Sequence, residues 1–337
     1  MTADRAPSVA MAADRPPSVD GRPPPRDRAY PPLLRRGDTV ALVSPAGPVT
    51  ERETALARDL LEEWGLRVRT TPRLNATHRG YLAGSDDERL DDFTEAWLHP
   101  DVRAVVCVRG GYGSQRIADR IDHGRLAAAG PKFLVGSSDI TCLHQALGER
   151  LHLVTLHGPM PGCRPVHEDE DTSTTLRAAL FGPSPRSFAL DGPVLVPGRA
   201  EAVLTGGNLT VLASSLGTAT APDTEGRILL LEDVGEDPYR LDRSLTQLRR
   251  AGVLRRTAGV VLGDFTDCGP PDRVADLMRD RLSDLAVPVV AGLSVGHGPR
   301  QLTVPLGARV VLRTDPPRLT LAAGHDRATG SRPTKDV

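Results

Sequence analysis

The stretch KFLVGSSDITCLHQALGER, residues 132–150, contains the transition that decides the fold. Its apolar run FLV ends at Gly136, and polar residues then lead into a segment whose apolar residues have helical spacing. A short apolar run without polar alternation is typical of a strand covered on both faces, as in a parallel sheet. The stretch therefore predicts a buried strand, a tight turn and a helix.

The same alternation of apolar runs and helical segments extends on both sides of this stretch. TVALVSPAG (39–47) and VRAVVCVRGGYG (102–113) are apolar runs that end in glycine and precede helical segments. Strands that alternate with helices form parallel sheets with the helices packed on the faces. We therefore predict an α/β fold in which residues 34–180 form an N-terminal, Rossmann-like domain with a parallel sheet.

The rest of the chain divides into a second domain and three further segments. Residues 201–324 alternate apolar runs and helical segments again and end in two β-like runs, which predicts a mixed α/β domain. Residues 181–200 are proline-rich without helical periodicity, which indicates a linker or a surface strand. The composition of residues 1–33 predicts a disordered leader, and residues 325–337 a polar tail. We expect the active site in the cleft between the two domains.

Charge and hydropathy argue against several classes of protein. The 42 basic residues nearly balance the 43 acidic ones, so the chain lacks the positive excess typical of nucleic-acid and anionic-membrane binders. No apolar run approaches the ~18 residues that would span a bilayer, and the N-terminus lacks the apolar core of a secretory signal. We therefore expect a cytoplasmic protein without nucleic-acid or membrane partners, although Arg35–Arg36 weakly resembles a twin-arginine export signal.

Cysteine and histidine spacing gives no indication of a metal site. The four cysteines are far apart and include no Cys-x-x-Cys pair, so we expect reduced thiols. The nine histidines include no His-Glu-x-x-His motif. The sequence therefore predicts neither a metal nor another cofactor.

The turn from Gly136 to Asp139 is the first of three places whose side chains suit catalysis. A serine on a strand-to-helix turn projects its hydroxyl outward, and the N–H groups that begin the helix can hold an anion. This suits a nucleophile, but serine and aspartate are also favoured helix caps, so capping is the alternative. Because Ile140 takes the place of the last glycine, the turn is not the Gly-x-Ser-x-Gly motif of the α/β-hydrolases.

The second place is the glycine tract RGGYG, residues 109–113. Its glycines permit positive φ and close approach of the backbone to a ligand, so the N–H of Gly111 could stabilise an oxyanion. A phosphate-binding loop has less support, because the tract has neither a Walker lysine nor a complete Gly-x-Gly-x-x-Gly. A tight turn that only requires glycine is the structural alternative. Arg109 could bind a substrate carboxylate or pair with an internal one.

The third place combines Glu232, at the end of the apolar run RILLLE, with His297, which lies between glycines. A carboxylate at a strand end could hold an imidazole in one tautomer and stabilise its charged form. Each residue also has a structural alternative, because Glu232 could form a salt bridge and His297 could lie on the surface. The two residues therefore form a candidate pair, and the position of His297 between glycines leaves its ring free to reach a serine.

Several motifs together resemble those of the LD-carboxypeptidase family of serine peptidases, also called the murein tetrapeptide carboxypeptidase or microcin-immunity family. The resemblance runs from about Arg36 to Ala323. It is carried by GDTVALVSPAGPV, RGYLAGSDDERLDDF, VRGGYGSQR, GSSDIT, LHGPM, TGGNLTVL, LLLEDVGEDPYRLDRSLTQL and GHGPRQLTVPLG, in the family's order.

The resemblance implies a catalytic triad in the chain order Ser, Glu, His. Ser138 matches the serine of the strand-turn-helix motif, Glu232 the glutamate of the strand ending in Glu-Asp, and His297 the histidine of the Gly-His-Gly loop. Backbone N–H groups of Gly111 and Asp139 would form the oxyanion hole. Arg109 and Tyr112 are then the candidate substrate-binding residues.

The implied activity is hydrolysis of an L,D-peptide bond, through an acyl-enzyme, to release a terminal D-alanine from a cell-wall tetrapeptide in peptidoglycan recycling. Another branch of the family hydrolyses an aminoacyl-nucleotide amide and gives immunity to a peptide antibiotic. The intact RGGYG tract favours the cell-wall branch. A non-catalytic peptide-binding module and a nucleotide-binding protein are alternatives from other classes.

Two departures from the family pattern limit what the resemblance implies. Ser137 stands where the family usually has an aromatic residue, which leaves the substrate preference open. The leader has no counterpart among the matched motifs and inherits no function. A homodimer is also left open by the sequence.

Overall fold

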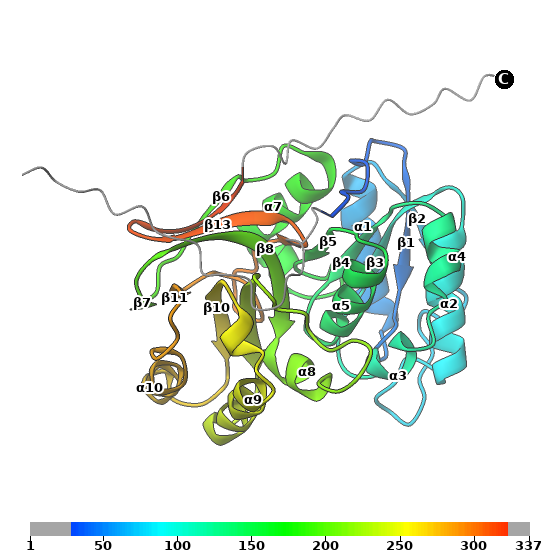
Figure 1. The fold of residues 1–337 in the computed structure, drawn as a ribbon. Coiled ribbons are helices and arrows are strands. Elements are labelled where there is room, and N and C mark those ends of the chain that lie inside the picture. Colours follow the sequence, from blue (N-terminus) through cyan, green and yellow to red (C-terminus); the bar gives the residue numbers. More distant parts are fainter. Residues whose placement is uncertain (1–27, 323–337) are drawn as a thin grey trace, which may run out of the picture.

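The computed structural model describes residues 28–322, which form two sheets that lie side by side with helices around them (Figure 1). The tail predicted for residues 325–337 and most of the predicted leader lie outside the described residues. Among residues 28–322, no helix combines the length and apolar composition needed to cross a bilayer.

The first sheet contains five parallel strands and one antiparallel strand at its edge. Its order is β12-β5-β4-β3-β1-β2. The strands are β1 (Thr39–Val43), β2 (Arg67–Thr70), β3 (Val102–Cys107), β4 (Phe133–Gly136), β5 (Thr155–His157) and β12 (Val304–Leu306). The order β2-β1-β3-β4-β5 is that of a doubly wound sheet, which binds ligands where the strand order reverses, outside the carboxyl ends of β1 and β3. The predicted α/β fold with a parallel N-terminal sheet is confirmed.

Helices cover both faces of the first sheet, as its buried, mostly apolar central strands require. Ala57 and Leu61 of α1 (Glu51–Glu63) and Leu176 of α7 (Glu170–Phe181) pack on one face. On the other, Phe93 and Trp97 of α2 pack with the remaining helices. These helices are α2 (Asp86–Leu98), α3 (Gln115–Ala118), α4 (His123–Ala128) and α5 (Thr141–Arg150). A short helix, α6 (Pro165–Glu168), precedes α7.

Capping boxes fix where two of these helices begin. At the start of α1, the Thr50 side chain accepts a hydrogen bond from the backbone N–H of Glu53. The Glu53 carboxylate in turn accepts one from the backbone N–H of Thr50. Ser85 and Glu88 make the same reciprocal pair at the start of α2. Each box satisfies two N–H groups that a helix start otherwise leaves without an acceptor.

The second sheet has a parallel centre and antiparallel strands at both ends. Its order is β6-β14-β13-β8-β9-β10-β11-β7, and β8 to β11 are parallel. The strands are β6 (Ser187–Ala189), β7 (Val194–Val196), β8 (Arg199–Asn208), β9 (Ile228–Val234), β10 (Gly259–Thr266), β11 (Val289–Ala291), β13 (Arg309–Thr314) and β14 (Pro317–Leu321). Helices α8 (Leu209–Ser214), α9 (Pro238–Arg250) and α10 (Pro271–Leu282) cover one face.

Two segments differ from their predicted roles, and a third follows one of its two predicted alternatives. Residues 181–200, predicted as a linker or a surface strand, contribute β6 and β7 to opposite ends of the second sheet. β12, predicted within the second domain, pairs with β5 of the first sheet, because β5 offers an open strand edge beside it. Residues 28–33 of the predicted leader are packed: Ala29 forms a bridge with Leu153, and Arg28 is buried against Glu149.

A buried ionic cluster joins the first and second sheets. Glu149 of α5 contacts the guanidinium groups of both Arg28 and Arg227, the residue before β9. Arg227 also donates to Asp223 at 2.9 Å. Both arginine side chains are less than a tenth exposed. Burial raises the pKa of Glu149, but its bonds to Arg227 and Arg28 outweigh this and lower the pKa, so the carboxylate is charged at neutral pH.

We predict that Glu149→Gln lowers the free energy of unfolding by roughly 3 kcal/mol at pH 7, because it leaves the buried Arg28 facing a neutral amide and Arg227 with Asp223 as its remaining carboxylate. Urea denaturation followed by circular dichroism measures the change. Glu168→Gln is the matched control, since Glu168 pairs with Arg164 on the surface and most of that pair is exposed. Equal effects of the two substitutions would contradict a stabilising role for the cluster.

Candidate active site

The turn after β4 presents Ser138 and hides Ser137. Ser138 begins a single turn of 3-10 helix, η1 (Ser138–Ile140), which runs directly into α5. Its φ is +60°, a left-handed conformation that is uncommon for residues other than glycine and is often found at functional sites. Ser138 is half-buried, whereas Ser137 is 3% exposed. The turn therefore offers the hydroxyl of Ser138, and not that of Ser137, to a ligand.

The alternative that these residues only cap a helix does not hold. Neither Ser137 at the start of η1 nor Ile140 at the start of α5 makes a side-chain cap. Asp139 instead accepts the backbone N–H of Ser114 at 2.7 Å, and the Ser114 hydroxyl donates to the carbonyl of Asp139. Burial raises the pKa of Asp139, and the bonds from Ser114 oppose this. The Asp139 side chain thus fastens the serine turn to the segment that follows the glycine tract.

The glycine tract after β3 lies against Ser138 at the point where the strand order reverses. A Cβ on Gly110 would lie 2.9 Å from the Cβ of Ser138, closer than any side chain allows. Gly111 has φ +118°, and a Cβ there would lie 2.9 Å from the Cα of Gly47. The N–H of Gly111 donates to no acceptor among residues 28–322. The tract therefore needs its glycines and leaves one N–H free beside the serine turn.

The Arg109 and Tyr112 side chains of this tract have different surroundings. Arg109 forms an ion pair with Glu53 of α1 at 3.5 Å. Of the two partners that the sequence suggested for Arg109, an internal carboxylate is therefore the one seen in the structure. The Arg109 side chain is still 41% exposed. Tyr112 is about half exposed, and its ring centroid lies 6.0 Å from that of Tyr81. Both residues are accessible to a ligand, and neither is committed to the core.

Glu232 and His297 form a buried hydrogen bond. Glu232 lies near the end of β9 with its side chain completely buried, and its Oε2 is 2.8 Å from Nδ1 of His297. Since a carboxylate accepts, Nδ1–H is the donor, and Nε2 keeps its lone pair while the ring is neutral. The side chain of His297 is 22% exposed. The predicted pair is therefore present, with one ring nitrogen available for proton transfer.

Asp264 of β10 holds the loop that carries His297. Its backbone N–H donates to the carbonyl of Val295 at 2.9 Å, and its carboxylate accepts the N–H of Gly298. Burial and the nearby charge of Glu232 raise the pKa of Asp264 to about 6. Burial lowers the pKa of His297, but the bond to Glu232 and the surrounding carboxylates outweigh it, so the pKa is raised. Sequence reasoning missed Asp264, because nothing in GVVLGDFT distinguishes its carboxylate from a surface one.

The topology brings Ser138 and His297 to the same boundary. β12 begins at Val304, a few residues after His297, and Val304 pairs with His157 of β5. His157 pairs on its other side with Gly136, just before the serine turn. No hydrogen bond joins Ser138 to His297 within residues 28–322. A hydrogen bond thus joins Glu232 and His297, and Ser138 lies on the turn after β4, the strand that pairs with β5.

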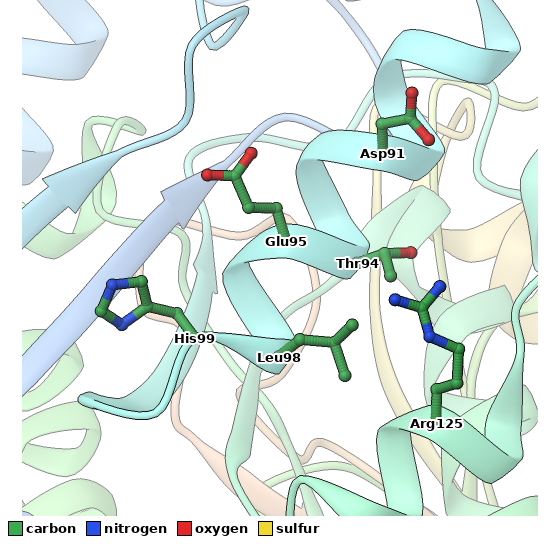
Figure 2. Close-up of a pocket in the computed structure, with 6 residues that line it drawn as sticks. All are labelled: Asp91, Thr94, Glu95, Leu98, His99 and Arg125. Carbon is green, nitrogen blue, oxygen red and sulfur yellow. The ribbon is translucent and has the colours of Figure 1, made fainter.

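A surface depression of about 450 Å³ lies away from these residues. Figure 2 shows it on the outer side of α2, with Arg125 of α4 across from Thr94. Its lining residues are Asp91, Thr94, Glu95, Leu98, His99 and Arg125. None of them was predicted for the site. Within residues 28–322, no group of three His, Cys, Asp or Glu side chains is arranged to hold a metal ion.

Comparison with known proteins shows which family has this architecture. Residues 40–158 match the profile of the LD-carboxypeptidase N-terminal domain, and residues 201–312 that of the LD-carboxypeptidase C-terminal domain. A protein of Streptomyces coelicolor is 46% identical over 300 residues, which cover 88% of this chain and 97% of that protein.

Two solved structures extend the comparison to the fold. The muramoyltetrapeptide carboxypeptidase of Oxalobacter formigenes is 32% identical, with a TM-score of 0.74 over 84% of this chain and 97% of that one. The microcin C7 self-immunity protein MccF has a TM-score of 0.79 over 88% of this chain and 98% of that one. Its identity is 22%, so this likeness shows a shared fold alone.

We predict that Gly296→Ala disrupts the bond between Glu232 and His297. Gly296 has φ +131°, and a Cβ there would lie 2.8 Å from Oε2 of Glu232, so the carboxylate or the loop must move. In proton NMR spectra, the downfield Nδ1–H resonance of His297 should disappear. Gly217→Ala is the control: Gly217 also has positive φ, but nothing lies within 4 Å of an added Cβ. A retained Nδ1–H resonance in Gly296→Ala would contradict the prediction.

Proposed function

This chain belongs to the LD-carboxypeptidase family of peptidases, and from that premise we propose that it is a serine carboxypeptidase that releases the terminal D-alanine of a cell-wall tetrapeptide. The observation that carries the proposal is the buried hydrogen bond between Glu232 and His297, on a loop that leads into the strand beside the Ser138 turn. The 32% identity to the muramoyltetrapeptide carboxypeptidase of Oxalobacter formigenes supports the substrate class.

In the first half of the reaction, His297 acts as the general base. Its Nε2 takes the proton of the Ser138 hydroxyl as Oγ attacks the scissile carbonyl carbon, and Glu232 stabilises the imidazolium that forms. The contact between the hydroxyl and Nε2 forms in the substrate complex, since catalytic hydrogen bonds often tighten only there. The N–H groups of Gly111 and Asp139 stabilise the tetrahedral oxyanion, and each such donor typically contributes about 10²–10³ in rate.

In the second half, the same imidazole acts as an acid and then again as a base. It protonates the amine of the leaving D-alanine as the carbon–nitrogen bond breaks, which leaves the rest of the peptide esterified to Ser138. A water molecule that gives its proton to His297 then attacks the ester. The shortened peptide leaves with a free carboxylate, and Ser138 regains its proton.

Recognition of the substrate terminus is assigned to the residues around the glycine tract. The guanidinium of Arg109 is 41% exposed and lies 3.5 Å from Glu53, a looser contact than a good charge-assisted hydrogen bond. A free terminal carboxylate can therefore compete for it. The exposed ring of Tyr112 provides an amphipathic surface at the edge of the tract. With a cytoplasmic location, the activity would serve the recycling of cell-wall peptides.

Hydrolysis of an aminoacyl-nucleotide is the second candidate. Its structural support is the likeness to MccF, which at 22% identity concerns the fold and not the substrate. The 32% identity to a muramoyltetrapeptide carboxypeptidase favours the cell-wall peptide. A non-catalytic peptide-binding role would leave the bond between Glu232 and His297 without a use, and a fluorophosphonate probe that labels Ser138 would exclude it.

We predict that Ser138→Ala lowers kcat on an L,D-tetrapeptide by about 10⁴ to 10⁶, because the covalent route is lost. Mass spectrometry of released D-alanine measures the rate. Ser137→Ala is the matched control: the Ser137 side chain is buried, so kcat should stay within about tenfold.

The substrate panel adds a D,D-pentapeptide, an aminoacyl-nucleotide and a tetrapeptide blocked as its terminal amide. Only the free L,D-tetrapeptide should be cleaved efficiently. Wild-type turnover by Ser138→Ala would end the proposed mechanism, and preferred cleavage of the aminoacyl-nucleotide would replace the proposed substrate.

The pH dependence of kcat/KM should follow the neutral form of His297. Because its pKa is raised, kcat/KM falls as the pH drops through that raised value. Asp264→Asn removes one of the charges that raise this pKa, while its amide oxygen can still accept the Gly298 N–H. The acidic limb should therefore move to lower pH.

Asp267→Asn is the control for this shift, since Asp267 is an exposed residue on the same segment and does not contribute to the pKa of His297. The pH profiles of the three proteins are compared on the same tetrapeptide. An acidic limb that stays in place in Asp264→Asn, or moves to higher pH, would show that His297 is not the titrating base.

A further inference from the structure

Two imidazoles face the carboxylate of Glu232 from different parts of the chain. His297, on the loop before β12, is bonded to Oε2. His157, the last residue of β5 in the first sheet, has its Nε2 3.9 Å from Oε1. The side chains of Glu232 and His157 are at most 1% exposed. The carboxylate is thus enclosed between a ring that reaches solvent and one that does not.

The atoms of His157 and Glu232 that face each other make no hydrogen bond at their present separation, although the Asn208 side chain also interacts with the Glu232 carboxylate. Among the described residues, neither ring nitrogen of His157 makes a hydrogen bond, and neither does Oε1 of Glu232. Leaving buried polar atoms unsatisfied costs about 1–3 kcal/mol each, so such groups are rarely left without a purpose. The 3.9 Å separation exceeds the ~3.2 Å limit for an N–H···O bond. A small shift of either side chain would complete the bond.

The surroundings of His157 fix its position. Its backbone is paired on both sides, with Gly136 and with Val304. The ring of His144 from α5 lies 6.0 Å away, centroid to centroid, and is itself held by Thr155 and by the carbonyl of Gly136. The backbone pairing and the neighbouring ring of His144 therefore hold His157 beside Glu232.

His157 also stays neutral in the pH range in which His297 titrates. Burial and the neighbouring rings of His144 and His297 lower the pKa of His157 to about 3. The pKa of His144 is lowered to about 4, chiefly by burial. The carboxylates of Asp233 and Asp264 act on His297 rather than on His157. At neutral pH, His157 is therefore a fixed N–H donor that takes no proton from the reacting groups.

We propose that His157 is a positioning residue whose Nε2–H bonds to Oε1 of Glu232, and so keeps the carboxylate aimed at His297 while charge develops on that ring. The inference rests on the proposed function. The bond limits rotation of the carboxylate about its last torsion, which would otherwise turn Oε2 away from Nδ1 of His297. It also stabilises the buried carboxylate as an anion, the form that supports an imidazolium.

Two substitutions separate positioning from packing. His157→Phe fills the space but removes the donor, and His157→Gln keeps an N–H donor near the position of Nε2. His157→Phe should still fold, because a ring of similar size fills the same buried space, although Oε1 of Glu232 then has no donor. Its kcat on the L,D-tetrapeptide should fall roughly 10- to 100-fold, the usual effect of losing a residue that orients another, with KM unchanged. His157→Gln should recover most of this loss.

A second readout does not depend on turnover. The downfield Nδ1–H resonance of His297 should persist in the wild type and in His157→Gln, and should broaden or vanish in His157→Phe. If the tetrapeptide is not cleaved by the wild type, the proposed function fails, and this resonance still tests the positioning. A stable His157→Phe variant with wild-type kcat, or one with an unchanged resonance, would overturn the inference.

Discussion

The carboxylate of Glu232 is completely shielded from water, and its hydrogen bond to His297 is the interaction around which this part of the molecule is built. A buried carboxylate without partners would be strongly destabilising or would take up a proton. The imidazole reaches it because Gly296 has no side chain, and a Cβ there would meet Oε2 at 2.8 Å. Gly296 is therefore a consequence of this contact, whereas Gly298 is required by the Asp264 carboxylate, which a Cβ there would meet at 2.6 Å.

The same contact determines how the two sheets are joined. The chain after His297 continues into β12, which leaves the second sheet and pairs with β5 of the first. This crossing places the end of β9, which carries Glu232, next to the ends of β4 and β5. The ionic cluster around Glu149 ties α5 to the residue before β9 and so supports the same arrangement. Because a site shared between two sheets needs a fixed boundary, these links are part of its construction.

The pKa values of the histidines at this boundary differ between the interior and the surface. The buried rings of His144 and His157 have lowered pKa values and stay neutral, whereas His297 has a raised pKa under the influence of Glu232, Asp233 and Asp264. A proton that arrives at the site is therefore held by the one imidazole that is also partly exposed. This is the property that acyl transfer with a single acid–base group requires.

Local sequence determined the parts of this protein that depend on neighbouring residues. The apolar runs that end in glycine predicted the parallel strands, because burial on both faces imposes a pattern within a few residues. The same reasoning placed Ser138 on a strand-to-helix turn and Glu232 near a strand end, and the motifs in their order identified the family. The pairing of His297 with Glu232 was a hypothesis from residue type and position, with structural alternatives open, and the resemblance to the family supported it.

Tertiary structure alone decided which distant groups meet. The crossing of β12 to the first sheet and the burial of Arg28 have no local pattern. The strands within residues 181–200 and the pairing of Arg109 with a carboxylate were alternatives that the sequence left open. His157 was one of nine histidines in the sequence, and only the folded chain places its ring against Glu232. The physical reason is that an open strand edge or a buried charge pairs with whichever group the fold brings close to it. The spacing of residues along the chain does not predict which group that is.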